Sequence, residues 1–228
     1  MGFEVHRRLS AADGVTLLNA VVGFVAGAVA FADLGLAARL LLLAVIVDAL
    51  DGIVARSGGS SDVGPLLDSI TDIVSFGVTP SLFVYVLLSD AVGGVETGDP
   101  LVVAGAAIVA SLYAVFSIVR TAFYSTYIDG ADDRPGMPNS LGAILLATGY
   151  LAGVTDPFVV AAAMAVLAVA QVSPFDYPKP GLTTVVPMGV VLSLSVVAPL
   201  AFRRAGPRIM LGIALLFFAL GPRYYWAE

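Results

Sequence analysis

The stretch that decides how this sequence is interpreted is VDALDGIVARSGGSSDVGPLLDSITD, residues 47–72. Four of its five aspartates form two pairs, Asp48 with Asp51 and Asp68 with Asp72. Residues three or four positions apart lie on the same face of an α-helix. Each pair is therefore expected to present two carboxylates from one helical face.

The rest of the chain has the composition of an integral membrane protein. Of its 228 residues 59% are hydrophobic and only 12% are charged, and the mean hydropathy is +0.97. Backbone groups in lipid must be hydrogen-bonded within the spanning element, which favours helices. We therefore predict an all-α, polytopic transmembrane helix bundle in a single domain, residues 1–228. About eight spans are expected, at 14–32, 36–56, 64–89, 100–127, 139–153, 157–173, 181–202 and 207–221.

Basic residues predict how the bundle is oriented. His6, Arg7 and Arg8 precede the first span, Arg56 follows the second, and Arg134 lies between the fourth and fifth. Positive residues collect on the cytoplasmic side, so a multi-pass cell-membrane protein with its acidic hairpin facing the cytoplasm is expected. Arg203, Arg204 and Arg208 fall on the other side. Either the last two spans are not a simple hairpin, or the charge bias is overridden there.

The two aspartate pairs lie on consecutive spans joined by a short loop, so their faces should meet near the membrane surface. Four converging carboxylates require cations, and carboxylate oxygens suit a hard divalent ion such as Mg²⁺ or Mn²⁺. Gly52 and Ala55 lie between the acids of the second span and its end. Such small residues let a flat ligand approach the backbone.

The order Asp48-x2-Asp51-Gly52-x2-Ala55-Arg56, followed by Gly64-x3-Asp68-x3-Asp72, resembles the signature of the CDP-alcohol phosphatidyltransferase family. The loop from Ser57 to Val63 has seven residues, one fewer than the family pattern. The resemblance implies a membrane enzyme that moves a phosphatidyl-type group from a CDP-linked lipid to an alcohol and releases CMP. It covers about residues 12–180, a six-helix catalytic core, with a further helix pair at about 181–221.

The same resemblance implies roles for the motif residues. Two divalent cations would be held by four ligands and a general base would be supplied by the last acid, with the CDP-lipid bound by the remaining positions. The implied metal ligands are Asp48, Asp51, Asp68 and Asp72, the base is Asp72, and the lipid-binding residues are Gly52, Ala55, Arg56 and Gly64. Members of the family commonly form homodimers, so a homodimer is expected as well.

Three further segments are similar to the phosphatidylserine synthases of this family. They are DSITDIVSFGVTPSL at 68–82, GMPNSLGA at 136–143 and VSPFDYPK at 172–179. The middle segment departs from the pattern at Met137 and at Asn139-Ser140. The similarity implies L-serine as the acceptor alcohol.

Candidate acceptor-binding residues are Arg120, Asn139, Ser140 and Arg134. Arg120 lies inside the fourth span, where a cation needs a partner; it either binds the acceptor or lipid phosphate, or pairs with an aspartate. Asn139 and Ser140 either contact the acceptor or cap a helix. Glycerol phosphate and inositol phosphate are the alternative acceptors, but these dianions call for more bases than Arg120 and Arg134 supply.

A membrane transporter is the alternative class, because acids inside a membrane can form ion paths. A transport function, however, does not explain why the residues occur in the sequence order Asp-Gly-x-x-Ala-Arg. The acidic composition, with 17 acids against 11 bases, indicates no nucleic-acid partner. It is also typical of a halophilic source, in which case the lipid would carry ether-linked archaeal chains.

Overall fold

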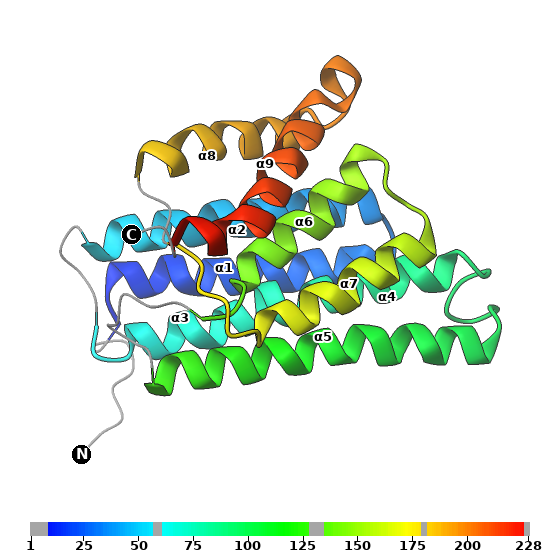
Figure 1. The fold of residues 1–228 in the computed structure, drawn as a ribbon, viewed down its shortest axis with the longest axis horizontal. Coiled ribbons are helices and arrows are strands. Elements are labelled where there is room, and N and C mark those ends of the chain that lie inside the picture. The colour runs from blue at the N-terminus through cyan, green and yellow to red at the C-terminus, as the bar shows by residue number, and fades with distance from the viewer. Residues whose placement is uncertain (1–8, 57–60, 128–134, 179–181, 226–228) are drawn as a thin grey trace.

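The computed structural model describes residues 9–56, 61–127, 135–178 and 182–225, and this part of the chain is built from helices (Figure 1). The expected all-α fold class is therefore confirmed. The helices are α1 (Ala11–Ala30), α2 (Leu34–Arg56), α3 (Gly64–Asp72), the π-helix η2 (Ile73–Val78), α4 (Thr79–Asp90), α5 (Pro100–Tyr127), α6 (Asn139–Ala152), α7 (Pro157–Gln171), α8 (Leu182–Val197) and α9 (Ala201–Tyr225).

Each predicted span corresponds to a helix, or to one continuous run of helices. Four are long and apolar enough to cross a membrane, namely Ala11–Ala30, the run Gly64–Asp90 formed by α3, η2 and α4, Pro100–Tyr127 and Ala201–Arg223. The apolar helices α6 and α7, together with Val185–Val197 of α8, are shorter. Helix α2 carries Arg39 and two of the signature aspartates among its apolar residues.

Helix α1 begins at Ala11, three residues before the predicted start. The Ser10 side chain accepts a hydrogen bond from the Asp13 backbone N–H, at 3.2 Å. In return the Asp13 carboxylate accepts one from the Ser10 N–H, at 2.5 Å. This capping box satisfies two N–H groups that a helix end leaves unpaired. The apolar run alone does not show it, because the residues that form the cap are polar.

The connection between α8 and α9 lies earlier than predicted. Helix α8 ends at Val197 rather than near residue 202, and the next helix is interrupted at Phe202, Arg203 and Arg204, whose φ angles are 48°, 59° and 65°. Left-handed backbone costs about 1–2 kcal/mol per non-glycine residue. Figure 1 shows α8 and α9 as an antiparallel hairpin at this bend.

The arginines at this end of the bundle bind backbone carbonyls. Arg204 Nη1 donates to the Leu151 carbonyl near the end of α6, at 3.4 Å. Arg39 Nε donates to the Val196 carbonyl near the end of α8, at 2.5 Å. Such carbonyls lack partners in their own helix and carry partial negative charge. The last two helices thus form a hairpin with a bend at residues 202–204, and Arg39 and Arg204 have structural partners there.

The signature aspartates lie at the opposite end of the bundle. Figure 1 shows the starts of α1 and α3 and the ends of α2 and α5 together at one end. Helices α1 and α2 pack along one another as an antiparallel pair, and α1 also packs against α3 and η2. This arrangement brings the acidic ends of α2 and α3 to the same place.

The π-helical segment follows directly after Asp72, where the sequence predicted an uninterrupted α-helix. Thr79 Oγ1 donates to the Val74 carbonyl at 2.8 Å and also lies 2.9 Å from the Gly23 carbonyl of α1. Ser75 Oγ donates to the Asn19 carbonyl of α1 at 3.1 Å. Single π turns occur frequently at functional sites. Here the hydroxyl groups of Ser75, in the π turn, and Thr79, directly after it, connect the acid-bearing helix to α1.

The close contact between α1 and η2 predicts a cost for any side chain at Gly23. A Cβ added there would lie 2.8 Å from Ser75 Cα, whereas one added at Gly14 in the same helix meets nothing within 4 Å. We expect Gly23→Ala to destabilise the protein by about 1–3 kcal/mol through overpacking. Gly14→Ala should leave stability unchanged or raise it by up to about 1 kcal/mol. Thermal unfolding in detergent measures both, and equal melting temperatures for the two variants would contradict the packing argument.

Candidate active site

Three of the four signature aspartates form one cluster. Asp48 of α2 and Asp68 and Asp72 of α3 each offer a carboxylate oxygen, and these oxygens lie within 4.8 Å of one another. Asp68 is exposed, and the other two are partly buried. The predicted meeting of two helical faces is therefore observed for these three acids.

Asp51 is held differently from the other three. Its side chain is 7% exposed, and Oδ2 accepts a hydrogen bond from the Thr16 hydroxyl of α1. It still lies within electrostatic reach of Asp48 and Asp68. The sequence did not single out Thr16 for this role, although a threonine and an asparagine one turn apart in TLLN, residues 16–19, mark a polar stripe on an apolar helix.

The donor set of the cluster fits a hard divalent cation. All its ligand atoms are carboxylate oxygens, which Mg²⁺ and Mn²⁺ prefer over softer metals. Within the described part of the chain, Asp72 Oδ1 is buried and has no hydrogen-bond partner. A buried charged oxygen without a partner is costly. A cation at the cluster would remove that cost.

The predicted lipid-binding positions lie around the acids, at the ends of α2 and α3. Gly64 is the first residue of α3, and a Cβ there would lie 3.1 Å from Asp13 Oδ1 of α1. The position therefore favours glycine for steric reasons. Gly52 is partly exposed beside Asp51. Ala55 and Arg56 end α2, but their side chains lie outside the described part of the structure.

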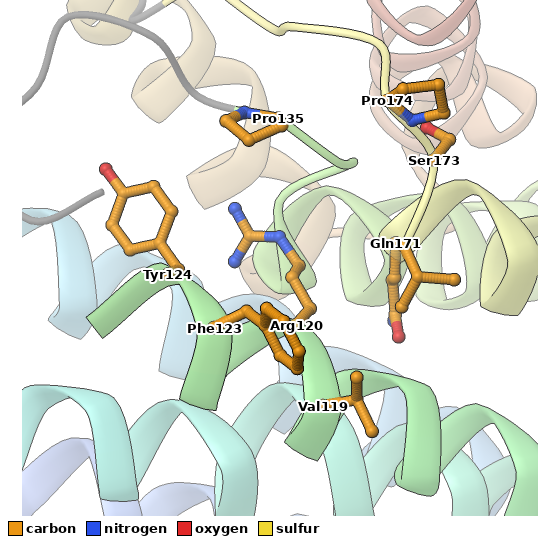
Figure 2. A pocket seen from close by; sticks show the side chains of 9 residues that line it. Val119, Arg120, Phe123, Tyr124, Pro135, Gln171, Ser173 and Pro174 are labelled. Atoms are coloured by element: carbon orange, nitrogen blue, oxygen red, sulfur yellow. The ribbon is translucent and has the colours of Figure 1, made fainter. Parts of the chain in front are cut away.

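Arg120 lies two turns before the end of α5 and lines a cavity of about 420 Å³. Figure 2 shows its guanidinium between Tyr124 and Pro135; its Cζ is 5.2 Å from the centroid of the Tyr124 ring. Arg120 is also within electrostatic reach of Asp72. The cavity wall comprises Val119, Arg120, Phe123, Tyr124, Pro135, Gln171, Val172, Ser173 and Pro174.

Two segments that were similar to family motifs pair with each other beside this cavity. The Gly136 N–H donates to the Phe175 carbonyl and the Met137 N–H to the Ala170 carbonyl, each at 2.9 Å. Gly136 has φ +81°, and a Cβ there would collide with the Gln171 carbonyl. The glycine of the first segment is therefore required for its contact with the end of α7, directly before the second segment.

The remaining acceptor candidates lie in different surroundings. Asn139 is buried and donates to Thr121 Oγ1 of α5 at 2.9 Å. The N-cap residue of α6 is Pro138, so the alternative that Asn139 or Ser140 caps this helix is wrong. Ser140 is partly exposed in the first turn of α6. Arg134 lies outside the described residues.

Sequence reasoning also missed a buried polar pair deeper between α5 and α7. Tyr113 and Gln171 are 0% and 1% exposed, and their side chains face one another. In Figure 2 the Gln171 side chain extends from the end of α7 towards α5. A tyrosine within a long apolar span gives little signal, because aromatic residues there most often serve packing.

Comparison with known proteins agrees with this geometry. The profile of the CDP-alcohol phosphatidyltransferase family matches residues 9–218. Archaetidylserine synthase of Methanothermobacter thermautotrophicus is 29% identical over 172 residues, which cover 73% of this chain and 69% of the relative. The CDP-diacylglycerol–serine O-phosphatidyltransferase of Methanocaldococcus jannaschii is 42% identical over 84 residues, 36% of this chain and 39% of the relative. The enzyme of that name from Saccharomyces cerevisiae is 37% identical over 94 residues, 37% and 34% of the two chains.

The long apolar helices and the carboxylate cluster at one end are features of a membrane-embedded transferase that acts on lipids with divalent cations. The match over residues 9–218 makes the assignment specific: this chain belongs to the CDP-alcohol phosphatidyltransferase family. The family depends on divalent cations in general, in agreement with the donor set of the cluster.

The cluster predicts that single carboxylate losses abolish turnover. Asp48→Asn or Asp68→Asn removes one charge and one ligand atom, so CMP release from a CDP-lipid should fall by at least about 10²-fold, as for other groups that stabilise charge in a transition state. Folding should survive, as judged by a monodisperse peak in detergent.

The matched control is Asp62→Asn, which changes an exposed acid just before α3. It should retain activity close to that of the unmodified enzyme. Full activity of either cluster variant at ordinary Mg²⁺ concentrations would show that these carboxylates do not form the metal site.

Proposed function

We propose that this protein transfers the phosphatidyl or archaetidyl group from a CDP-linked lipid to the hydroxyl of L-serine and releases CMP. The observation that carries the proposal is the carboxylate cluster of Asp48, Asp68 and Asp72 within electrostatic reach of Arg120, which lines a cavity. The names of the three relatives, all serine transferases, support the acceptor.

In the proposed reaction, the serine hydroxyl oxygen attacks the lipid-side phosphorus of the diphosphate. The bond from that phosphorus to the oxygen of CMP breaks, and CMP leaves with the electron pair. Asp72 accepts the proton of the serine hydroxyl, as a general base positioned beside the nucleophile. Two divalent cations, Mg²⁺ or Mn²⁺, would when bound offset the negative charge of the diphosphate and of the leaving group.

The residues proposed to hold the cations are Asp48, Asp51, Asp68 and Asp72. The hydrogen bond from Thr16 uses Oδ2 of Asp51, so its other carboxylate oxygen can serve as a ligand on the α2 side of the cluster. Gly52, Ala55, Arg56 and Gly64 are proposed to bind the CDP-lipid. A glycine such as Gly52 lets a ligand approach the backbone closely.

Arg120 is proposed to bind the serine carboxylate. Among the described residues that line its cavity, Arg120 is the one cation. A single guanidinium suits the carboxylate of a zwitterion, which it can grip through two parallel hydrogen bonds. Glycerol phosphate or inositol phosphate would instead bring a dianion to this guanidinium, and a dianion calls for more than one base. Asn139, Ser140 and Arg134 are proposed as further acceptor contacts.

Several finer assignments are part of the same proposal. We place the protein in the cell membrane as a multi-pass protein with the acids facing the cytoplasm, on the basis of the positive-inside pattern. The archaeal relative favours an ether-linked lipid over an ester-linked one. A homodimer, expected from the family, stays a prediction.

The acceptor is tested by offering labelled serine, glycerol phosphate or inositol phosphate to the purified protein with a CDP-lipid and Mn²⁺ or Mg²⁺. Serine alone should be incorporated. Arg120→Lys should raise the KM for serine by about 10- to 100-fold, because lysine keeps the charge but loses the bidentate fork, a loss of about 1.5–3 kcal/mol. The KM for the CDP-lipid should change little.

Arg208→Lys is the matched control, because this exposed arginine lies in α9 at the opposite end of the bundle. Its kinetics should equal those of the unmodified enzyme. An equal rise in both KM values for Arg120→Lys would assign this arginine to the lipid phosphate or to the scaffold. Incorporation of a phosphorylated acceptor in place of serine would contradict the proposed function.

Ligand binding should be coupled to the divalent cation. A ligand that binds the folded state raises the melting temperature, and we expect a CDP-lipid to do so in detergent only when Mg²⁺ or Mn²⁺ is present. The measurement is a thermal melt with and without a chelator. Stabilisation that responds to monovalent ions and not to divalent ones would instead support the transporter alternative.

A further inference from the structure

Asn19 of α1 is a buried polar residue that the reaction described above does not use. Its side chain is 0% exposed, and within the described part of the chain neither the amide nitrogen nor the amide oxygen has a hydrogen-bond partner. Burial of an amide without compensation costs about 1–3 kcal/mol. Most of the helix around it is apolar, so a leucine would pack there without that cost.

Two hydrogen bonds fix the level of Asn19 relative to the acids. Thr16, one turn before Asn19, bonds to Asp51 of α2. Because α1 and α2 run in opposite directions, the next turn of α1 lies level with the preceding turn of α2. That turn carries Asp48.

The second hydrogen bond comes from η2, the π-helix that follows Asp72. Ser75 Oγ donates to the Asn19 carbonyl at 3.1 Å, and Ser75 lies three residues after Asp72 on the same run of helix. Asn19 is therefore level with Asp48 and about one turn deeper in the bundle than Asp72. At this level of the bundle Asp72 Oδ1, like both polar atoms of the Asn19 amide, is buried without a hydrogen-bond partner in the described structure.

We propose that Asn19 is a positioning residue of the metal centre. Its amide N–H groups hold the inner carboxylate oxygens of Asp48 and Asp72 through an ordered water. Buried polar atoms that lack protein partners are commonly joined in this way. The outer oxygens of the same carboxylates are thereby turned towards the cation.

This role explains why an unsatisfied amide is kept in the core. Groups that orient metal ligands contribute to metal affinity, and their loss typically weakens binding by about 10- to 100-fold. The inference rests on the proposed function, because it presupposes that the cluster binds a divalent cation. It adds a second residue of α1, after Thr16, to a site whose metal ligands come from α2 and α3.

The test is Mn²⁺ binding to the purified protein in detergent, without lipid or serine, followed by the electron paramagnetic resonance signal of free Mn²⁺. Asn19→Leu should weaken Mn²⁺ binding by about 10-fold or more. Its melting temperature without metal should stay close to that of the unmodified protein, because a leucine suits this apolar helix and offsets the loss of the water-mediated contacts. A fold defect would instead lower the melting temperature.

Asn19→Asp gives a second measurement that keeps the side-chain size. The added negative charge beside the carboxylates should lower the melting temperature without metal, and saturating Mn²⁺ should restore much of the loss. A purely structural asparagine would give the same decrease at every Mn²⁺ concentration. Ser75→Ala is the matched control, because it alters the same contact between α1 and η2 but leaves the amide in place, and should bind Mn²⁺ normally.

The outcomes separate the two proposals. If the unmodified protein binds no Mn²⁺, the metal site of the proposed function is overturned. If it binds Mn²⁺ and Asn19→Leu binds equally well, only the role of Asn19 is overturned. Weakened binding in Asn19→Leu with normal binding in Ser75→Ala supports the inference.

Discussion

The carboxylates of Asp48 on α2 and of Asp68 and Asp72 on α3 repel one another, and the rest of the structure depends on this constraint. Two like charges about 4 Å apart repel by about 4 kcal/mol at an effective dielectric constant of 20, and three oxygens here lie within 4.8 Å. A whole domain is stable by only about 5–15 kcal/mol. Without a cation, the surrounding helices must hold together groups that would otherwise move apart.

Helix α1 supplies much of that restraint through polar groups in an apolar setting. Thr16 holds Asp51, and the α1 carbonyls of Asn19 and Gly23 accept hydrogen bonds from Ser75 and Thr79 on the other acidic helix. The glycine at position 23 lets the backbones come close enough for these bonds. The acid-bearing helices are thus both tied to α1, which fixes their relative positions.

Local patterns predicted the helices and the acid pairs, because apolar runs and spacings of three or four residues are properties of one segment. The π turn after Asp72, the bond from Thr16 to Asp51 and the left-handed residues 202–204 depend on neighbouring helices, so the local pattern carries little sign of them. Asn139 illustrates the difference. A polar residue at the start of a helix predicts a helix cap. Asn139 instead donates a hydrogen bond to Thr121 of α5, and the sequence around Asn139 does not show that α5 packs there.

The arginines at the two ends of the bundle have different partners. At the end opposite the acids, Arg39 and Arg204 donate hydrogen bonds to backbone carbonyls near helix ends. Arg120 is placed otherwise: it lies on the acidic side, over the ring of Tyr124, within reach of Asp72 and on a cavity wall. An aromatic face attracts the cation and excludes water from one side of it. Under the proposed function, a guanidinium in that position would hold an incoming carboxylate on the cavity side of the acid cluster, as binding of a zwitterionic alcohol requires.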